Sequence, residues 1–275
     1  MSNLAVIVKK PEIQARFSEV LGDKKESFVS SLITVSNQTG LKKCEPMSVI
    51  SAAMIAASLD LPINPSLGFN YIIPYGSKAT YQIGYKGLIQ LALRSGKYER
   101  IHACVVYDGD LISYNRFSDE MVFKDGPAES DKIIGFFAMI KTVNGFRKNI
   151  YWTVEEVKKH ANKFSQTYRN GRGVWKDNFE AMGIKTVLKQ LLSKYGILSI
   201  EMQSAIEADQ TADGEYIDNV EVVGQESAKQ LFENTIEIDN KVSDLQTTES
   251  PAKVVEKDLG ISDVSEDETK GVLFQ

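Results

Sequence analysis

The chain has 275 residues, of which 43% are hydrophobic and 25% are charged, a composition typical of a folded protein with a sizeable core. It has no apolar run of about 18 residues, so we expect no membrane span. The short apolar patch near its start lacks a cleavage-type sequence, so we expect no signal peptide and a cytoplasmic location.

The net charge of −5 averages two unlike segments. Residues 1–206 hold 27 basic and 19 acidic residues, a net charge of +8, whereas residues 207–275 hold 5 basic and 18 acidic residues, a net charge of −13. A basic body followed by an acidic tail is typical of a nucleic-acid-binding protein, although such a tail can also serve only to keep a protein soluble.

Three helices are expected first, at 11–21, 25–39 and 46–59. Pro11 suits the first position of a helix, and Gly22 follows the end of that helix. The third segment is rich in alanine, and small side chains let helices approach closely. We therefore expect a helical N-terminal layer that packs either on the body of the protein or on a neighbouring subunit.

A β-hairpin that leads into a helix is expected between residues 61 and 100. Aromatic residues favour strands on both sides of a turn at 74–77, and from Gly84 to Gly96 the apolar residues recur at helical spacing. Basic residues alternate here with tyrosines, and Glu99 is the only acid between Asp60 and Asp108. Cations neutralise phosphates and aromatic rings stack on unpaired bases, which suits a nucleic-acid strand. Lysines that protect sheet edges are the alternative interpretation.

Further strands are expected at 98–107, 111–115, 121–124, 133–143 and 146–152, with a hairpin turn at Asn144 and Gly145. Together these elements predict five to seven mostly antiparallel strands and an α+β fold, in which a small antiparallel sheet with hairpins packs on helices. The two cysteines, Cys44 and Cys104, stand in apolar surroundings and should be buried free thiols.

A helix should begin after Thr153, because Glu156 three residues later completes a capping box; Val157 and Ala161 should then face inward. The polar segment 165–173 that follows should be a mobile loop, and its two arginines either close over a bound strand or are simply solvated.

The longest helix is expected at 175–195, followed by a short one at 199–207. Lys185 and Lys189 are four residues apart and therefore share one stripe of the long helix. No acid lies between Glu180 and Glu201 to neutralise these two lysines. Their like charges repel each other, which costs stability unless an anion lies opposite them. Beyond it we expect a largely disordered acidic tail over 208–275, with apolar islands at 228–238 and 272–274 that fold on a partner.

Several kinds of chemistry are not indicated. The segment Gly183-Ile184-Lys185-Thr186 lacks the Gly-Lys pair of a phosphate-binding loop, so ATP-driven strand exchange is not expected. No zinc-ligand spacing occurs, and Asp108 and Asp110 form only a glycine-centred turn rather than the carboxylate cluster of a two-metal nuclease. We therefore expect no enzyme activity, no cofactor and no metal.

Six ordered motifs identify a resemblance that spans roughly residues 10–205. They are LPINP at 61–65, YxxPYG at 71–76, QIGYKGL at 82–88, LAxRSG at 91–96, VYDGD at 106–110 and WxxxFxxMxxKTxxK at 175–189. In these the chain resembles the RecT family of phage single-strand DNA annealing proteins, which are distantly similar to the Redβ proteins. The resemblance implies an α+β core with a DNA groove, and rings or helical filaments in which many copies of the subunit share that groove. It also implies ATP-independent pairing of complementary single strands into an annealed duplex. It also implies that the acidic tail recruits a phage exonuclease and a host single-strand-binding protein. A passive single-strand-binding coat protein is the alternative.

The expected DNA-binding residues fall into groups by position. The residues that match family motifs are Gly84, Tyr85, Lys86, Gly87, Arg94, Lys185 and Lys189. The two glycines are expected to let the backbone approach a phosphate near the start of a helix. Those on the hairpin, expected to touch bases or wedge between them, are Tyr75, Lys78 and Tyr81. Further basic residues expected to line the groove, from the central unit and the long helix, are Lys97, Arg100, Lys176 and Lys194. Those chosen on charge and loop position alone are Arg147, Lys148, Arg169 and Arg172.

Overall fold

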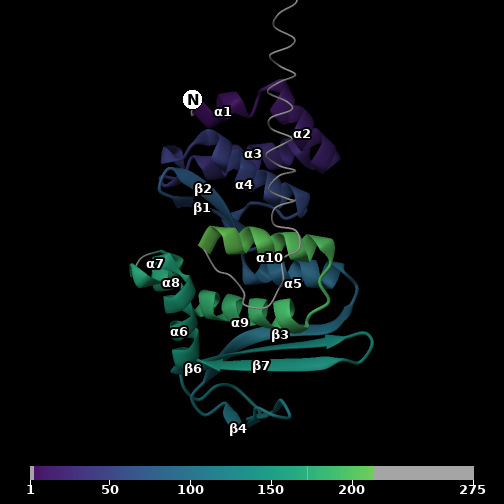
Figure 1. The fold of residues 1–275 in the computed structure, drawn as a ribbon, viewed down its shortest axis with the longest axis vertical. Coiled ribbons are helices and arrows are strands. Elements are labelled where there is room, and N and C mark those ends of the chain that lie inside the picture. The colour runs from purple at the N-terminus through teal and green to yellow at the C-terminus, as the bar shows by residue number, and fades with distance from the viewer. Residues whose placement is uncertain (1–2, 172, 214–275) are drawn as a thin grey trace, which may run out of the picture. The chain divides into compact units, whose positions relative to one another are not determined.

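The computed structural model describes residues 3–171 and 173–213 (Figure 1). By its contacts the chain divides into two units, Met1–Ile217 and Asp218–Gln275, and every described residue belongs to the first. The apolar islands at 228–238 and 272–274, and the expected disorder beyond residue 213, therefore lie outside the described residues, as does Arg172.

The N-terminal layer consists of helices, as expected. They are α1 (Asn3–Ile7), α2 (Pro11–Leu21), α3 (Lys25–Ser36) and α4 (Pro46–Ser58), with 3₁₀ turns at Gly22–Lys24, Leu41–Lys43 and Pro65–Leu67. Helix α1 has no counterpart in the sequence prediction. Four alanines of α4, at positions 52, 53, 56 and 57, are buried, and this helix packs against the hairpin that follows. The layer thus packs on the body of its own chain.

The expected hairpin and helix are confirmed as β1 (Asn70–Tyr75), β2 (Lys78–Ile83) and α5 (Tyr85–Arg94). The two strands are antiparallel, with Tyr75 opposite Lys78 at the turn. A separate three-stranded antiparallel sheet has the order β3 (Tyr98–Tyr107), β6 (Ile133–Thr142) and β7 (Arg147–Thr153). Strands β4 (Leu111–Asn115) and β5 (Glu120–Phe123) form a third small hairpin. These elements confirm the α+β fold and its antiparallel strands.

Helix α6 (Val154–Phe164) begins with the predicted capping box: the Thr153 hydroxyl accepts from the Glu156 N–H at 3.2 Å, and the Glu156 carboxylate accepts from the Thr153 N–H at 2.7 Å. Val157 and Ala161 are buried, as expected. The polar segment after α6 differs from the prediction, because Ser165 caps a short helix, α7 (Gln166–Arg169). Both cysteines are free thiols; Cys44 is buried, but Cys104 is only half-buried.

The long C-terminal helix was predicted as one piece but is two, α8 (Val174–Asp177) and α9 (Phe179–Tyr195). They are separated by Asn178, whose φ of −149° and ψ of 63° are not helical and whose side chain caps α9 by accepting from the Ala181 N–H. The last helix within the described ranges, α10 (Ile200–Asp213), continues six residues past the expected core boundary at 207.

Helix α9 lies between the three-stranded sheet and helix α5, and α10 packs on β2, α5 and α4 (Figure 1). Because α9 is covered on most sides, all residues from Met182 to Leu192 are buried. No helix within the described ranges is long and apolar enough to cross a membrane.

Candidate nucleic-acid interface

A groove of about 440 Å³ separates the central hairpin and helix from the start of α9. One wall comes from residues within 65–71 and 82–86, and the other from residues within 174–185. Among its lining residues are Gly84, Tyr85, Lys86 and Lys185, all expected to bind DNA. The fold therefore brings two motifs that are about a hundred residues apart in the chain to one surface depression.

Gly84 and Gly87 shape the first wall by allowing two backbone segments to touch. A Cβ atom on Gly84 would lie 2.2 Å from the carbonyl oxygen of Gly68, and one on Gly87 would lie 2.1 Å from that of Phe69. The Gly84 N–H also donates to the Phe69 carbonyl at 2.8 Å. In this structure the two glycines allow another segment of the protein's own backbone to come close. The sequence had instead predicted a close approach to a phosphate.

The N-terminus of α5 opens on the groove through Tyr85 and Lys86. Its N-cap residue is Gly84, which offers no side-chain acceptor, and the first turn contains no acidic residue. The N–H groups of a first helical turn carry partial positive charge and favour anions. The exposed Lys86 adds a full charge, so this wall is suited to a phosphate group.

Lys185 and Lys189 are buried and share one counter-ion from within the chain. The Nζ of Lys185 lies 2.7 Å from Oδ1 of Asp209, and the Nζ of Lys189 lies 2.8 Å from Oδ2. Burial alone would raise the pKa of the Asp209 carboxyl, but the two ammonium groups outweigh it and hold that pKa below its usual value. The expected anion opposite these lysines is therefore a carboxylate of α10.

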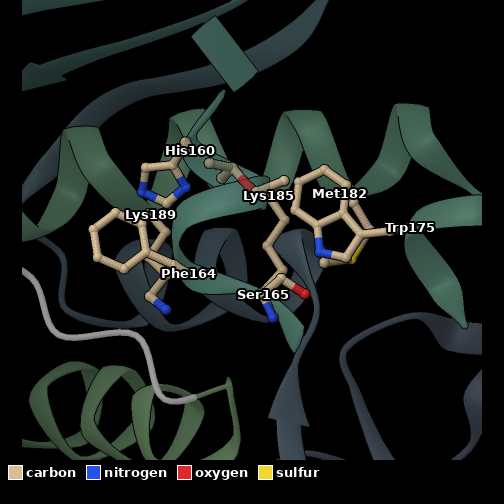
Figure 2. A pocket seen from close by; sticks show the side chains of 9 residues that line it. His160, Phe164, Ser165, Trp175, Met182, Lys185 and Lys189 are labelled. Atoms are coloured by element: carbon tan, nitrogen blue, oxygen red, sulfur yellow. The ribbon is translucent and has the colours of Figure 1, made fainter. Parts of the chain in front are cut away.

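Figure 2 shows how the two lysines lie next to a small internal cavity. Their side chains extend from α9 in the same direction, between Trp175 on one side and His160 and Phe164 on the other. The cavity has a volume of about 20 Å³, which is room for one water molecule and not for a nucleotide. Lys189 lines this cavity but is not among the residues of the larger groove.

On the hairpin, the structure separates the three expected residues. Lys78 is exposed beside the turn and Tyr75 is half-buried, whereas Tyr81 is 1% exposed and does not reach the surface. The buried Tyr81 hydroxyl has no hydrogen-bond partner among residues 3–171 and 173–213. Burial and the nearby Asp209 charge both raise its pKa, so this phenol stays protonated.

Arg94 has a structural role in this conformation. It donates to the carbonyl oxygens of Leu59 at 2.9 Å and Asp60 at 2.8 Å, which close the end of α4. It lines a different pocket, of about 370 Å³, between α2–α3 and the loop after α4. Lys97, Arg100, Lys176 and Lys194, also expected in the groove, are exposed but are not among the residues that line it.

Arg147, Lys148 and Arg169, which were chosen on charge alone, do not line the groove. Arg147 lines a pocket beside β5, and Lys148 pairs with Asp119 while lying 4.6 Å from the centre of the Tyr195 ring. Arg169 donates to the carbonyls of Asn162 and Lys163 at the end of α6 instead of reaching out over a strand.

Comparison with known proteins decides the family. The model of the RecT family matches residues 26–223. The chain belongs to the RecT family. It is 42% identical over 257 residues to the uncharacterized protein YqaK of Bacillus subtilis, covering 89% of each chain. It is 30% identical over 179 residues to protein RecT of Escherichia coli, covering 62% of this chain and 65% of that one.

Membership of the RecT family associates the chain with DNA binding, single-strand annealing and recombination. Two residues of the groove region were missed by sequence reasoning, Asp209 and the helix-breaking Asn178. The sequence contained a signal for a residue such as Asp209. Lysines surrounded by apolar residues on one helix are rarely buried without a counter-charge. In the described part of the chain, no group of three or more His, Cys, Asp or Glu side chains is placed to hold a metal ion.

Proposed function

We propose that this RecT-family protein binds single-stranded DNA through its sugar–phosphate backbone in the groove between the hairpin–α5 unit and α8–α9, and pairs complementary strands without ATP. The observation that carries the proposal is the groove itself, where the open N-terminus of α5 and Lys86 face the start of α9. A helix N-terminus and a lysine bind phosphate without regard to base sequence.

Backbone binding explains how such a protein promotes pairing. Two single strands repel each other through their phosphates, and a cationic surface lowers that repulsion while concentrating the strands. If the protein contacts phosphates, the base edges remain free to test for complementarity. Many weak contacts then give high affinity when identical subunits line up, so the proposal includes a ring or helical filament with a shared groove. The exposed Lys97, Arg100, Lys176 and Lys194 are candidates for extending the groove between subunits.

The acidic tail is proposed to recruit other proteins of recombination, such as a phage exonuclease and a host single-strand-binding protein. Its charge supports this role, because residues 214–275 hold 15 acidic and 5 basic residues and would be repelled by DNA.

The experiment compares pairing rates of two complementary labelled oligonucleotides with and without protein, in the absence of nucleotide. An annealing protein accelerates pairing, whereas a passive coat protein binds each strand but leaves the rate unchanged or slows it. Incubation of labelled DNA with magnesium tests for nuclease activity in the same samples.

Lys86→Ala tests the groove, with Lys42→Ala in the N-terminal layer as the matched control, since both lysines are exposed and only Lys86 lines the groove. We expect Lys86→Ala to weaken single-strand binding and to reduce the slope of log affinity against log salt by about 0.7 for each phosphate that is no longer neutralised. An unchanged slope would remove this groove from the DNA path.

A further inference from the structure

We infer that Asp209 is a positioning residue that fixes the positions of the two walls of the groove relative to each other. This inference rests on the proposed function of the groove and identifies the residue that sets its geometry. Asp209 is almost completely shielded from solvent, because its side chain is 1% exposed. It lies on α10, which contributes no residue to the groove lining, so it acts only through the residues it binds.

The carboxylate is bonded to both walls at once. Its Oδ1 atom accepts from the backbone N–H of Ile83 at 3.1 Å and from Nζ of Lys185 at 2.7 Å. Ile83 immediately precedes Gly84, Tyr85 and Lys86 in the first wall, and Lys185 belongs to the second. A single oxygen atom therefore joins the end of β2 to the middle of α9.

The bond to Ile83 has a further structural consequence. Ile83 is the last residue of β2, and its partner across the hairpin is Asn70. Without the carboxylate, the N–H of this buried residue would lose its acceptor, and an unsatisfied buried N–H destabilises the fold. Asp209 thus fixes the point where the strand ends and α5 begins, which sets the direction of the helix N-terminus at the groove.

Simple electrostatics and positioning predict opposite effects for the same substitution. Asp209 is negative and lies behind a surface proposed to bind a polyanion, so removing its charge should strengthen DNA binding if charge alone matters. If Asp209 holds the walls in place, its removal should weaken binding instead. The direction of the change in affinity also tests a further alternative, in which the carboxylate only occupies a place on the two lysines that a DNA phosphate would otherwise take. In that case its removal should strengthen binding.

The experiment uses the full chain and three variants, each checked for folding by near-ultraviolet circular dichroism. Asp209→Asn removes the charge and keeps the size of the side chain, and Asp209→Glu keeps the charge but displaces it. Glu201→Gln is the matched control, because it removes the same charge from an exposed site on the same helix. We expect Asp209→Asn to lower affinity for single-stranded DNA about tenfold, the scale typical of removing a residue that supports a site. Asp209→Glu should recover part of this affinity, and Glu201→Gln should not lower it.

A second readout does not depend on DNA. Spin labels at Ser66→Cys and Val174→Cys, in a chain with both natural cysteines replaced by alanine, report the distance between the walls, since both positions are exposed and line the groove. We expect a narrow distance distribution in the parent chain and a broad or shifted one with Asp209→Asn or, if that variant does not fold, with Asp209→Glu. An unchanged distribution, or a rise in affinity, would overturn the inference. A broadened distribution in a protein that does not bind DNA would leave the positioning role intact and reject the proposed function.

Discussion

The carboxylate of Asp209 lies 2.7 Å from the ammonium of Lys185, a residue 24 positions earlier in the chain, and neither side chain is more than 7% exposed. Lys189 binds the other oxygen of the same carboxylate. A buried charge is tolerated only with a partner, so the burial of each of these three residues depends on the others. The first residues of what the charge pattern defines as an acidic tail are in this way part of the folded core.

Replacement of Asp209 by Asn should lower the free energy of unfolding by about 3–5 kcal/mol at neutral pH, because it leaves buried ammonium groups without their counter-ion. The effect should depend on pH. The folded state lowers the pKa of this carboxyl, so the stabilisation is complete above the ordinary value of about 3.9 and is lost as the pH falls through the lower, folded-state pKa. Urea unfolding of both proteins between about pH 7 and pH 3 measures the difference; a gap that stays constant down to the lowest pH would contradict the assignment.

Local signals in the sequence predicted most of the fold. Strand β3 was predicted with its observed bounds from its run of β-branched and aromatic residues, and the α6 capping box from Thr153 and Glu156 alone. Both depend on neighbours within a few residues. The break at Asn178 was missed because tertiary packing, and not helix propensity alone, decides where one helix ends.

The groove was only partly predictable for the same reason. The motif residues Gly84 to Lys86 and Lys185 were expected in one groove, and all four line the same surface depression. Their individual environments could not be read from spacing. The exposed fraction of Lys185 depends on Asp209, and that of Tyr81 depends on α4 and α10, which pack on β2.

Gly87→Ala tests the close packing of α5 on the preceding loop. Alanine in a helix is ordinarily favoured over glycine by about 1 kcal/mol, but here the new methyl group would meet a backbone oxygen at 2.1 Å and the Ile83 side chain at 2.8 Å. We therefore expect a net loss of about 1–3 kcal/mol in the free energy of unfolding. Leu93→Ala on the same helix is the control, since Leu93 is 51% exposed and should change stability by much less. A Gly87→Ala protein as stable as the parent would show that the loop shifts freely.

The substitution Tyr81→Phe tests whether Tyr81 stays buried or contacts a base of bound DNA. The hydroxyl is buried without a hydrogen-bond partner in the described part of the chain, so its removal should leave stability unchanged or raise it by up to about 1 kcal/mol. Binding of single-stranded DNA should be unaffected. Urea unfolding and a fluorescence binding titration test both statements, and Tyr75→Phe at the half-buried hairpin turn is the comparison. A loss of affinity specific to Tyr81→Phe would mean that the hairpin opens when DNA binds.

Two truncations locate the end of the folded core. A chain that ends at residue 217 keeps α10 and the carboxylate of Asp209, and should melt at the temperature of the full chain and anneal oligonucleotides at the same rate. A chain that ends at residue 207, the boundary suggested by composition, loses Asp209 and the last turns of α10. Its Lys185 and Lys189 are then buried without this counter-ion, and a loss of about 3–5 kcal/mol corresponds to a fall in melting temperature of roughly 10 °C for a core of this size. Both chains lack the 14 acidic residues beyond residue 217, so a difference between them cannot come from the charge of that part of the tail. Equal melting temperatures would show that the lysines find another partner or reach solvent, and the role of Asp209 in both stability and groove geometry would then have to be given up.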